Sequence, residues 1–307
     1  MIRIKYINEY GTLEWGGGQH PSLNILGNIT GLGLPSVETT KVKYEGFDGL
    51  FPTTEKYLSR TITFKFTLQS YDLQRETRRI YKILSEKGTL QLLFGQSKRS
   101  IEVTQKPTVS DFERTHVIRD FTVQFVCDYP FFTDLAPVTQ TCFDLQEQIN
   151  GNQDLTEPFI WTKPINKVSV YNNGDLKTFP KIYIRNIGTV PMDSTEKLGY
   201  EILKVRADYD LSLDSLPVED DIISRFYLPI TTEIGEEIVI NFDTRDEKGR
   251  YCVSSVSGNI ASKRSDDSTF EFYLDVGENK IVVNNYNSNE QIVCNIEYNN
   301  RYLEATY

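Results

Sequence analysis

The side chains best suited to catalysis are scarce in this chain. It has only two histidines, His20 and His116, and a Ser/His/Asp or Cys/His centre would need one of them as its base. Neither histidine lies in a nucleophile elbow or beside a cysteine. Residues 16–20, with the sequence GGGQH, follow neither the GxxxxGKS/T nor the GxGxxG order of phosphate-binding loops. The sequence therefore predicts no catalytic residues and no phosphate-binding loop.

Metal-ligand spacings are not found in the sequence either. The four cysteines, Cys127, Cys142, Cys252 and Cys294, form no CxxC pair, and free cysteines in strands behave as small buried hydrophobic residues. Acidic residues gather between 208 and 221, but without the central glycine and the glutamate at position twelve of an EF-hand loop. We interpret them as a solvated acidic loop, and we expect no metal and no other cofactor.

Charge is distributed unevenly along the 307 residues, which are enough for two ordinary domains. Residues 1–133 hold 17 Lys+Arg and 14 Asp+Glu, a net of +3, whereas residues 134–307 hold 16 and 29, a net of −13. An acidic second half argues against nonspecific nucleic-acid binding. No stretch approaches the ~20 apolar residues of a spanning helix, and no apolar signal follows Met1. We expect a soluble protein made in a reducing cytoplasm.

The elements that would position any site are mainly strands. Alternating apolar and polar residues predict strands at Thr61–Leu68, which we interpret as an exposed edge strand, and at Phe121–Cys127. Between them, an apolar stripe at three- and four-residue spacing predicts one helix at about 72–87, with Gly88 as a left-handed stop. The glycine-rich first 35 residues predict loops and short strands. Together these features indicate an α+β first domain, a sheet or small sandwich with one covering helix.

The second half predicts an antiparallel β-sandwich, because short strands alternate with turn residues and no helix intervenes. A connector with several prolines, at about 128–165, precedes it. The stretch after residue 185 is interpreted as acidic and loop-rich. Strands are expected at Val168–Tyr171, Lys181–Arg185, Glu237–Phe242, Tyr251–Val256, Phe270–Val276, Lys280–Asn284 and Ile292–Tyr298. We therefore expect a mainly β protein with domains at 1–133 and 134–307.

Several separated segments share motifs with a known family. In the first half they are residues 45–49 (EGFDG), 60–64 (RTITF), the arginine-bearing helix and 123–132 (VQFVCDYPFF). In the second half they are residues 173–182 (NGDLKTFPKI), 277–281 (GENKI) and 297–303 (EYNNRYL). In this order and spacing they resemble the distal tail proteins of long-tailed, siphovirus-type bacteriophages and prophages. The resemblance covers nearly the whole chain apart from residues 9–35.

The resemblance implies a structural role at the virion tail tip, after synthesis in the cytoplasm of the bacterial host. Members of the family form a ring, usually described as a hexamer. Their N-terminal domains make the ring, and their C-terminal galectin-like sandwiches project outward. The implied partners are further copies of the chain, the major tail protein of the tube, the tail-associated hub and fibre protein, and receptor-binding or baseplate proteins. DNA would pass through the lumen without specific binding, no membrane would be bound, and no enzymatic activity is implied.

This role implies two groups of contact residues. Subunit or partner contacts are expected at Gly46, Phe47, Asp48, Gly49, Arg60, Arg75, Arg78 and Arg79. Packing between the domains is expected where a linker would normally be polar, at Tyr129, Pro130, Phe131 and Phe132.

Two other classes of function stay open. The second domain could be a carbohydrate-binding module for the host cell wall, although both histidines lie before residue 134 and the galectin-type cluster of histidine, asparagine, arginine and tryptophan is not found. A tail-tip wall hydrolase is the third class, and no zinc triad or catalytic cysteine pattern favours it.

Overall fold

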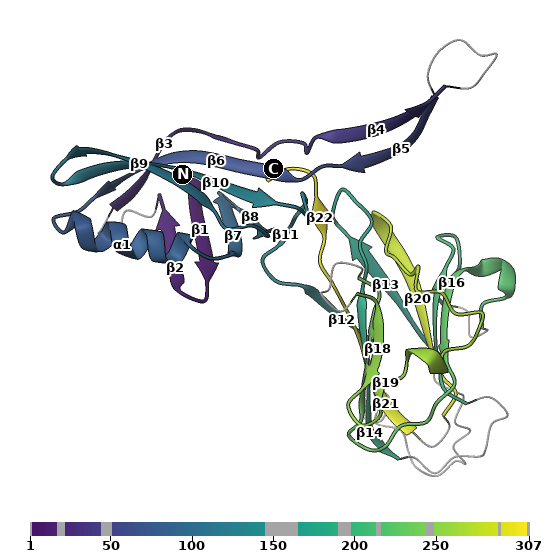
Figure 1. Ribbon diagram of the computed structural model, residues 1–307. Coiled ribbons are helices and arrows are strands. Elements are labelled where there is room, and N and C mark those ends of the chain that lie inside the picture. The colour runs from purple at the N-terminus through teal and green to yellow at the C-terminus, as the bar shows by residue number, and fades with distance from the viewer. Residues whose placement is uncertain are drawn as a thin grey trace. The chain divides into compact units, whose positions relative to one another are not determined.

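The computed structural model describes residues 2–16, 22–43, 51–144, 165–189, 198–212, 216–243, 249–287 and 290–305. The fold is mainly β, which confirms the predicted class, and the described strand pairs are antiparallel (Figure 1). The chain divides into two compact units. The first comprises Met1–Leu135 with Arg301–Tyr307, and the second comprises Ala136–Asn300.

Two sheets form the body of the first unit. The six-stranded sheet contains, in spatial order, β2 (Gly11–Trp15), β1 (Ile2–Asn8), β7 (Gly88–Phe94), β8 (Ser97–Val103), β11 (Phe132–Asp134) and β22 (Arg301–Tyr302). The four-stranded sheet contains β3 (Ser22–Thr30), β6 (Arg60–Gln69), β10 (Ile118–Cys127) and β9 (Thr108–Thr115). The prediction that Thr61–Leu68 is an edge strand is wrong, because β6 pairs with β3 on one side and with β10 on the other.

The alternation that predicted these strands determines the core of the first unit. Ile62, Phe64 and Phe66 of β6 are fully or almost fully buried, whereas Thr61 and Lys65 on the other face of the strand are exposed. Phe66 stacks on Phe121 of β10 with ring centroids 4.9 Å apart. Strands of both sheets contribute to this single apolar cluster, so the inner faces of the two sheets form one core.

Helix α1 (Leu73–Leu84) covers this core with the predicted apolar stripe, and Asp72 caps its start by accepting a hydrogen bond from the Arg75 amide. The predicted left-handed stop at Gly88 is wrong. The helix ends at Leu84, and Gly88 opens β7, where a Cβ atom would lie 2.3 Å from the Ile7 carbonyl oxygen. Close backbone packing explains this glycine.

The glycine-rich N-terminus contains more regular structure than the sequence predicted. It supplies β1, β2 and β3, and its glycines lie where the chain turns: Gly16 and Gly31 have φ values of 80° and 83° and approach other backbone segments closely. A left-handed conformation at such points favours glycine. These glycines therefore lie just after the ends of strands, and the glycine-rich composition is compatible with regular strands.

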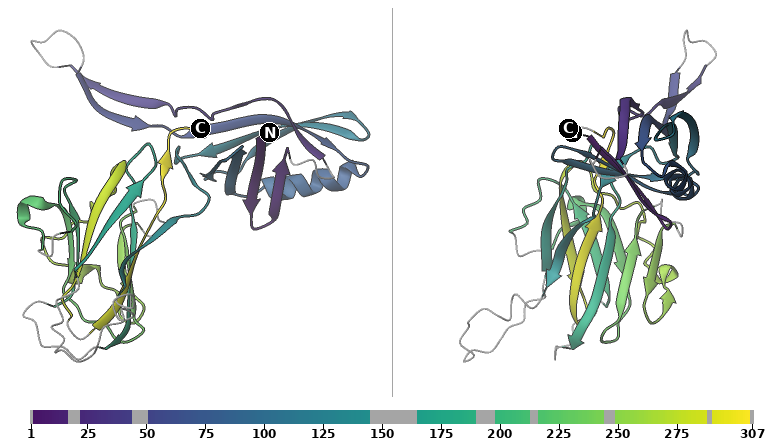
Figure 2. Two further views of the ribbon diagram at one scale, coloured as in Figure 1. Left: turned by 180° about the vertical axis from the view of Figure 1, so that it is seen from behind. Right: turned by 90° about the vertical axis from the view of Figure 1, so that its left-hand side faces the viewer.

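A two-stranded hairpin, which we call the arm, extends from the sandwich of the first unit (Figures 1 and 2). It consists of β4 (Val37–Val42) and β5 (Phe51–Tyr57), which pair only with each other. Most described arm side chains are exposed, including the apolar Val37 and Val42. An isolated hairpin of this kind has little stability of its own.

The second unit also contains a six-stranded and a four-stranded sheet. The first has the order β12 (Val138–Asp144), β21 (Glu290–Tyr298), β14 (Lys181–Thr189), β17 (Glu237–Asn241), β18 (Tyr251–Ser254) and β19 (Gly258–Asn259). The other has the order β13 (Ile165–Asn172), β20 (Gly277–Asn285), β15 (Tyr200–Val205) and β16 (Ile222–Leu228). Two short 3-10 helices, η1 (Glu219–Asp221) and η2 (Ala261–Lys263), complete the unit.

Two sequence interpretations in the second unit are wrong. The stretch after residue 185, interpreted as a loop, contains β15 and β16. Conversely, residues 270–276 do not form the predicted strand, because their only ladder contact is an isolated bridge between Leu274 and Thr178. Phe272 and Leu274 are still fully buried. The alternation of apolar residues therefore correctly indicates which side chains are buried, although the segment is not paired as a strand.

The last described residues return to the first unit. Strand β22 pairs with β11, and the Ala305 amide donates to the Leu32 carbonyl. The sequence assigned all of residues 134–307 to the second domain, whereas Arg301–Tyr307 belong to the first unit.

Candidate functional site

Arg60, the first residue of β6, is the most highly connected of the candidate contact residues. Its side chain is buried, with 4% exposed. Nε donates to the Pro130 carbonyl at 2.7 Å, and Nη1 donates to the Gly31 and Gly33 carbonyls at 2.8 and 2.7 Å. Nη2 donates to the Leu303 carbonyl at 2.6 Å. One guanidinium therefore fixes three chain segments that are far apart in sequence.

The surroundings of Arg60 are unusual for a cation, because its hydrogen bonds go to backbone carbonyl oxygens. Its guanidinium also lies 4.5 Å from the centroid of the Phe132 ring. Burial lowers its pKa from 12.5 to about 10, opposed by nearby Cys127. Arg60 remains charged at neutral pH, and the carbonyl dipoles and the ring balance that charge. Its donors are used inside the first unit, so its role there is structural.

The three arginines of α1 are placed differently. Arg75, Arg78 and Arg79 are exposed on the helix face opposite its buried stripe. Arg79 makes an ion pair with Glu76 at 3.3 Å, and it donates to the Thr12 carbonyl at 3.4 Å. Arg75 and Arg78 have no side-chain polar partner among the described residues. They form a basic, solvent-facing surface, as a contact surface requires.

The remaining predicted contacts are those of residues 46–49. Gly46, Phe47, Asp48 and Gly49 lie outside the described residues, between β4 and β5 in sequence. The sequence singled out residues 46–49 but did not predict the strands β4 and β5 that precede and follow them.

The aromatic segment predicted to pack between domains contacts residues of the first unit. Phe132 is fully buried in the first core, and Phe131 makes edge contacts with Tyr57 and Tyr129 at 5.1 and 5.0 Å. The Arg301 guanidinium lies over the Phe131 and Tyr129 rings at 4.5 and 5.0 Å. These contacts join the base of the arm to the returning C-terminal strand.

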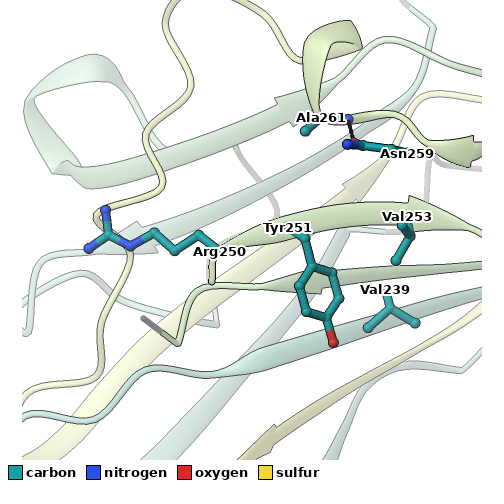
Figure 3. Close-up of a pocket in the computed structure, with 6 residues that line it drawn as sticks. All are labelled: Val239, Arg250, Tyr251, Val253, Asn259 and Ala261. Carbon is teal, nitrogen blue, oxygen red and sulfur yellow. Dashed lines mark hydrogen bonds between the residues drawn. The ribbon is translucent and has the colours of Figure 1, made fainter. Parts of the chain in front are cut away.

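A shallow pocket opens on the six-stranded sheet of the second unit (Figure 3), with a volume of about 340 Å³. Its lining comes from β17, β18, the residue before β18, β19 and the start of η2: Val239, Arg250, Tyr251, Val253, Asn259 and Ala261. In the sequence Tyr251 is only the first residue of an expected strand, and no pattern there indicates the pocket.

Reactive groups are not gathered elsewhere in the described structure. Within the described ranges, no three His, Cys, Asp or Glu residues lie close enough to hold a metal ion. All four cysteines are free and buried, and burial raises the pKa of Cys127, Cys142 and Cys252 to about 12. Such thiols are protonated and poor nucleophiles at neutral pH. No helix in the described ranges has the length and apolar character needed to cross a membrane.

No protein-family model and no curated protein matches the chain. Solved structures do match. One is the crystal structure of the Dit protein of SPP1, described as a paradigm of the hub adsorption apparatus in phages that infect Gram-positive hosts. It is 13% identical with a TM-score of 0.63, and the match covers 98% of this chain and 99% of that one.

A second match is the phage P2 baseplate in its activated conformation with Ca, at 11% identity and a TM-score of 0.50. It covers 97% of this chain and 98% of that one. The chain therefore shares its fold with these phage proteins along nearly its whole length.

Proposed function

We propose that this protein is a structural distal tail protein of a long-tailed phage or prophage and not an enzyme. Copies of the chain would form a ring, usually a hexamer in the resembled family, between the tail tube and the tail-tip hub. The observation that carries the proposal is the fold match to SPP1 Dit over 98% of this chain and 99% of that chain. Both units take part in a match of that length, which a single shared sandwich would not produce.

The first unit has the surfaces that a ring requires. A cyclic ring needs a heterologous interface, in which one face of each subunit binds a different face of the next. The four-stranded sheet ends in two edge strands, β3 and β9, and β9 exposes Phe112. The arm and the basic face of α1 add two further surfaces on the same unit. Contact with a neighbouring copy would cover the apolar arm residues and protect the sheet edges.

In this role the ring would join the major tail protein of the tube to the tail-associated hub and fibre protein. The second units would provide docking surfaces for receptor-binding or baseplate proteins. DNA would pass through the lumen without being retained, and the assembled protein should not retard DNA in a gel at low salt. Clear retardation would contradict this part of the proposal.

Co-assembly with neighbouring tail proteins tests the proposal. The purified protein is mixed with the tube and hub proteins encoded beside its gene, and the mixture is separated by size-exclusion chromatography. We expect stable complexes with both proteins. Absence of both complexes would refute the tail-hub role.

A second function, carbohydrate binding, is favoured by one feature of the second unit. The pocket beside Tyr251 places an aromatic ring next to polar side chains on an open sheet face, a combination suited to saccharides. Binding of a panel of glycans to the purified protein tests this function, and the ring proposal does not depend on it.

A further inference from the structure

The floor of the pocket is an apolar patch built by strand register. Val239 of β17 lies opposite Val253 of β18, and Val253 lies opposite Asn259 of β19. Tyr251 is two residues before Val253, so both side chains are on the same face of the strand. Tyr183 of β14 pairs with Val239 and extends this patch across a fourth strand. The floor therefore combines Tyr251 with two valines, and Tyr183 borders it on the neighbouring strand.

Polar groups with unused hydrogen-bonding capacity border this floor. The Asn259 Oδ1 accepts from the Ala261 amide at 3.0 Å, which leaves the Nδ2 donors of Asn259 without a partner in the described structure. The Arg250 Nε is shielded from solvent without a hydrogen bond, and Arg250 makes no ion pair within the described ranges. By contrast, Lys204 of the same unit pairs with Asp275 at 2.6 Å, and Arg206 pairs with Asp208 at 2.7 Å.

Arg250 is a cation in a unit whose sequence, residues 134–307, carries a net charge of −13. A guanidinium offers planar, paired donors that match carboxylate and phosphate groups. In Figure 3 the Arg250 side chain extends away from the Tyr251 ring, and Val239 and Val253 lie on the other side of that ring. A ligand that uses both the ring and the cation must therefore be extended.

We propose that this pocket binds an anionic oligosaccharide. One sugar ring would pack its apolar face on Tyr251 and the two valines, and Asn259 would donate to its hydroxyl groups. A carboxylate or phosphate on a neighbouring sugar would bind the Arg250 guanidinium. The proposal deepens the carbohydrate-binding function and is independent of ring formation, since every residue used lies in the second unit of one chain.

Calorimetric titration of the full chain at low salt tests the proposal. The probes are tetragalacturonate, a phosphorylated maltotetraose, and neutral maltotetraose. We expect one or both anionic probes to bind about tenfold more tightly than the neutral one, and the probe that binds identifies the anion. Tyr251→Ala and Arg250→Gln should each weaken that binding about tenfold. Arg206→Gln, which removes an exposed arginine at the end of β15, should leave it unchanged.

Three results would overturn the proposal. They are no saturable binding of either anionic probe at millimolar concentration, equal binding of neutral maltotetraose, or unchanged binding in both pocket variants. Circular dichroism establishes that each variant is folded. Since the titration needs no ring, a negative result here leaves the tail-hub proposal standing, and failure to assemble leaves this proposal testable.

Discussion

The Nη2 atom of Arg60 donates a hydrogen bond of 2.6 Å to the carbonyl oxygen of Leu303, which lies 243 residues further along the chain. Both residues belong to the first unit. The chain therefore leaves this unit after residue 135, forms the second unit and returns, and a buried cation fixes the returning segment. The first unit is consequently built from two separate stretches of the chain, Met1–Leu135 and Arg301–Tyr307.

Replacing Arg60 should destabilise the first unit strongly. Arg60→Met removes the donors from one buried and three partly buried carbonyl groups, and we expect a loss of about 3 kcal/mol in unfolding free energy. Arg60→Lys should recover only part of this loss, because an ammonium group cannot reproduce the planar fork. Urea unfolding followed by Trp15 fluorescence, in a Trp161→Phe background, reports on the first core in which Trp15 is buried.

An exposed arginine provides the control for this measurement. Arg206→Met should change the unfolding free energy by less than about 0.5 kcal/mol. An Arg60→Met protein as stable as the parent would show that the four carbonyl contacts are not important for the fold.

The buried thiols predict a pH dependence of stability. Burial raises the pKa of Cys127, Cys142 and Cys252 from 9.0 to about 12, so the folded state favours the protonated thiol. Below pH 9 both states are protonated, and between pH 9 and 12 the unfolded state ionises first. The unfolding free energy should therefore fall as pH rises through this window. A variant with all four cysteines replaced by alanine should lose stability less steeply.

The reactivity of the thiols tests the burial of the four cysteines independently. In native protein at pH 7.5, none of the four cysteines should react rapidly with Ellman's reagent, and all four should react in denaturant. A rapidly reacting thiol in the native protein would contradict the burial of these residues.

The basic face of α1 should matter for assembly and not for folding. Arg75→Glu combined with Arg78→Glu should abolish the ring, because reversed charge at an interface opposes docking. Both side chains are exposed, so the unfolding free energy should change by less than about 0.5 kcal/mol. Arg206→Glu with Lys263→Glu, two exposed positions in the second unit, applies the same charge change as a control. A double variant at 75 and 78 that still forms rings would exclude this surface.

The arm should likewise be needed for ring assembly but not for the stability of the first unit. Val37 and Val42 are 47% and 38% exposed on a hairpin without a core of its own. Changing both to aspartate should prevent ring formation, while the urea midpoint read by Trp15 stays unchanged. Val256→Asp with Val276→Asp, which are 58% and 56% exposed in the second unit, is the matched control. A lower midpoint for the arm variant would indicate that the arm supports its own unit.

Strands with strict alternation and one buried face could be predicted from the sequence. β6 and β10 fit this description, and so does α1 with its apolar stripe. β15 could not be predicted in this way, because all six of its residues are buried and neither face is solvent-exposed. Its outer face packs Leu203 and Val205 against Tyr209 and Val282.

Charged residues within β15 made this strand still harder to predict from the sequence. Buried Glu201 accepts hydrogen bonds from Tyr286 and Asn284 at 2.6 and 3.0 Å, and Lys204 pairs with Asp275. In sequence these charged residues resemble a solvated loop, since their partners lie on other segments.

The sites were harder to predict than the strands. The sequence singled out Arg60 through its motif, but its carbonyl partners come from residues 31, 33, 130 and 303, and no local pattern brings these together. Exposed helix arginines could be predicted from periodicity alone. The pocket depends on cross-strand register between β17, β18 and β19, which sequence spacing does not reveal.

The mass of the assembled protein tests the central claim most directly. Light scattering with negative-stain microscopy is applied to the purified chain, alone and with the tube and hub proteins. We predict a closed ring of about six copies with an open centre, formed by the chain alone or on those partners. A protein that stays monomeric in both conditions would contradict the proposal that this chain is a ring-forming tail protein.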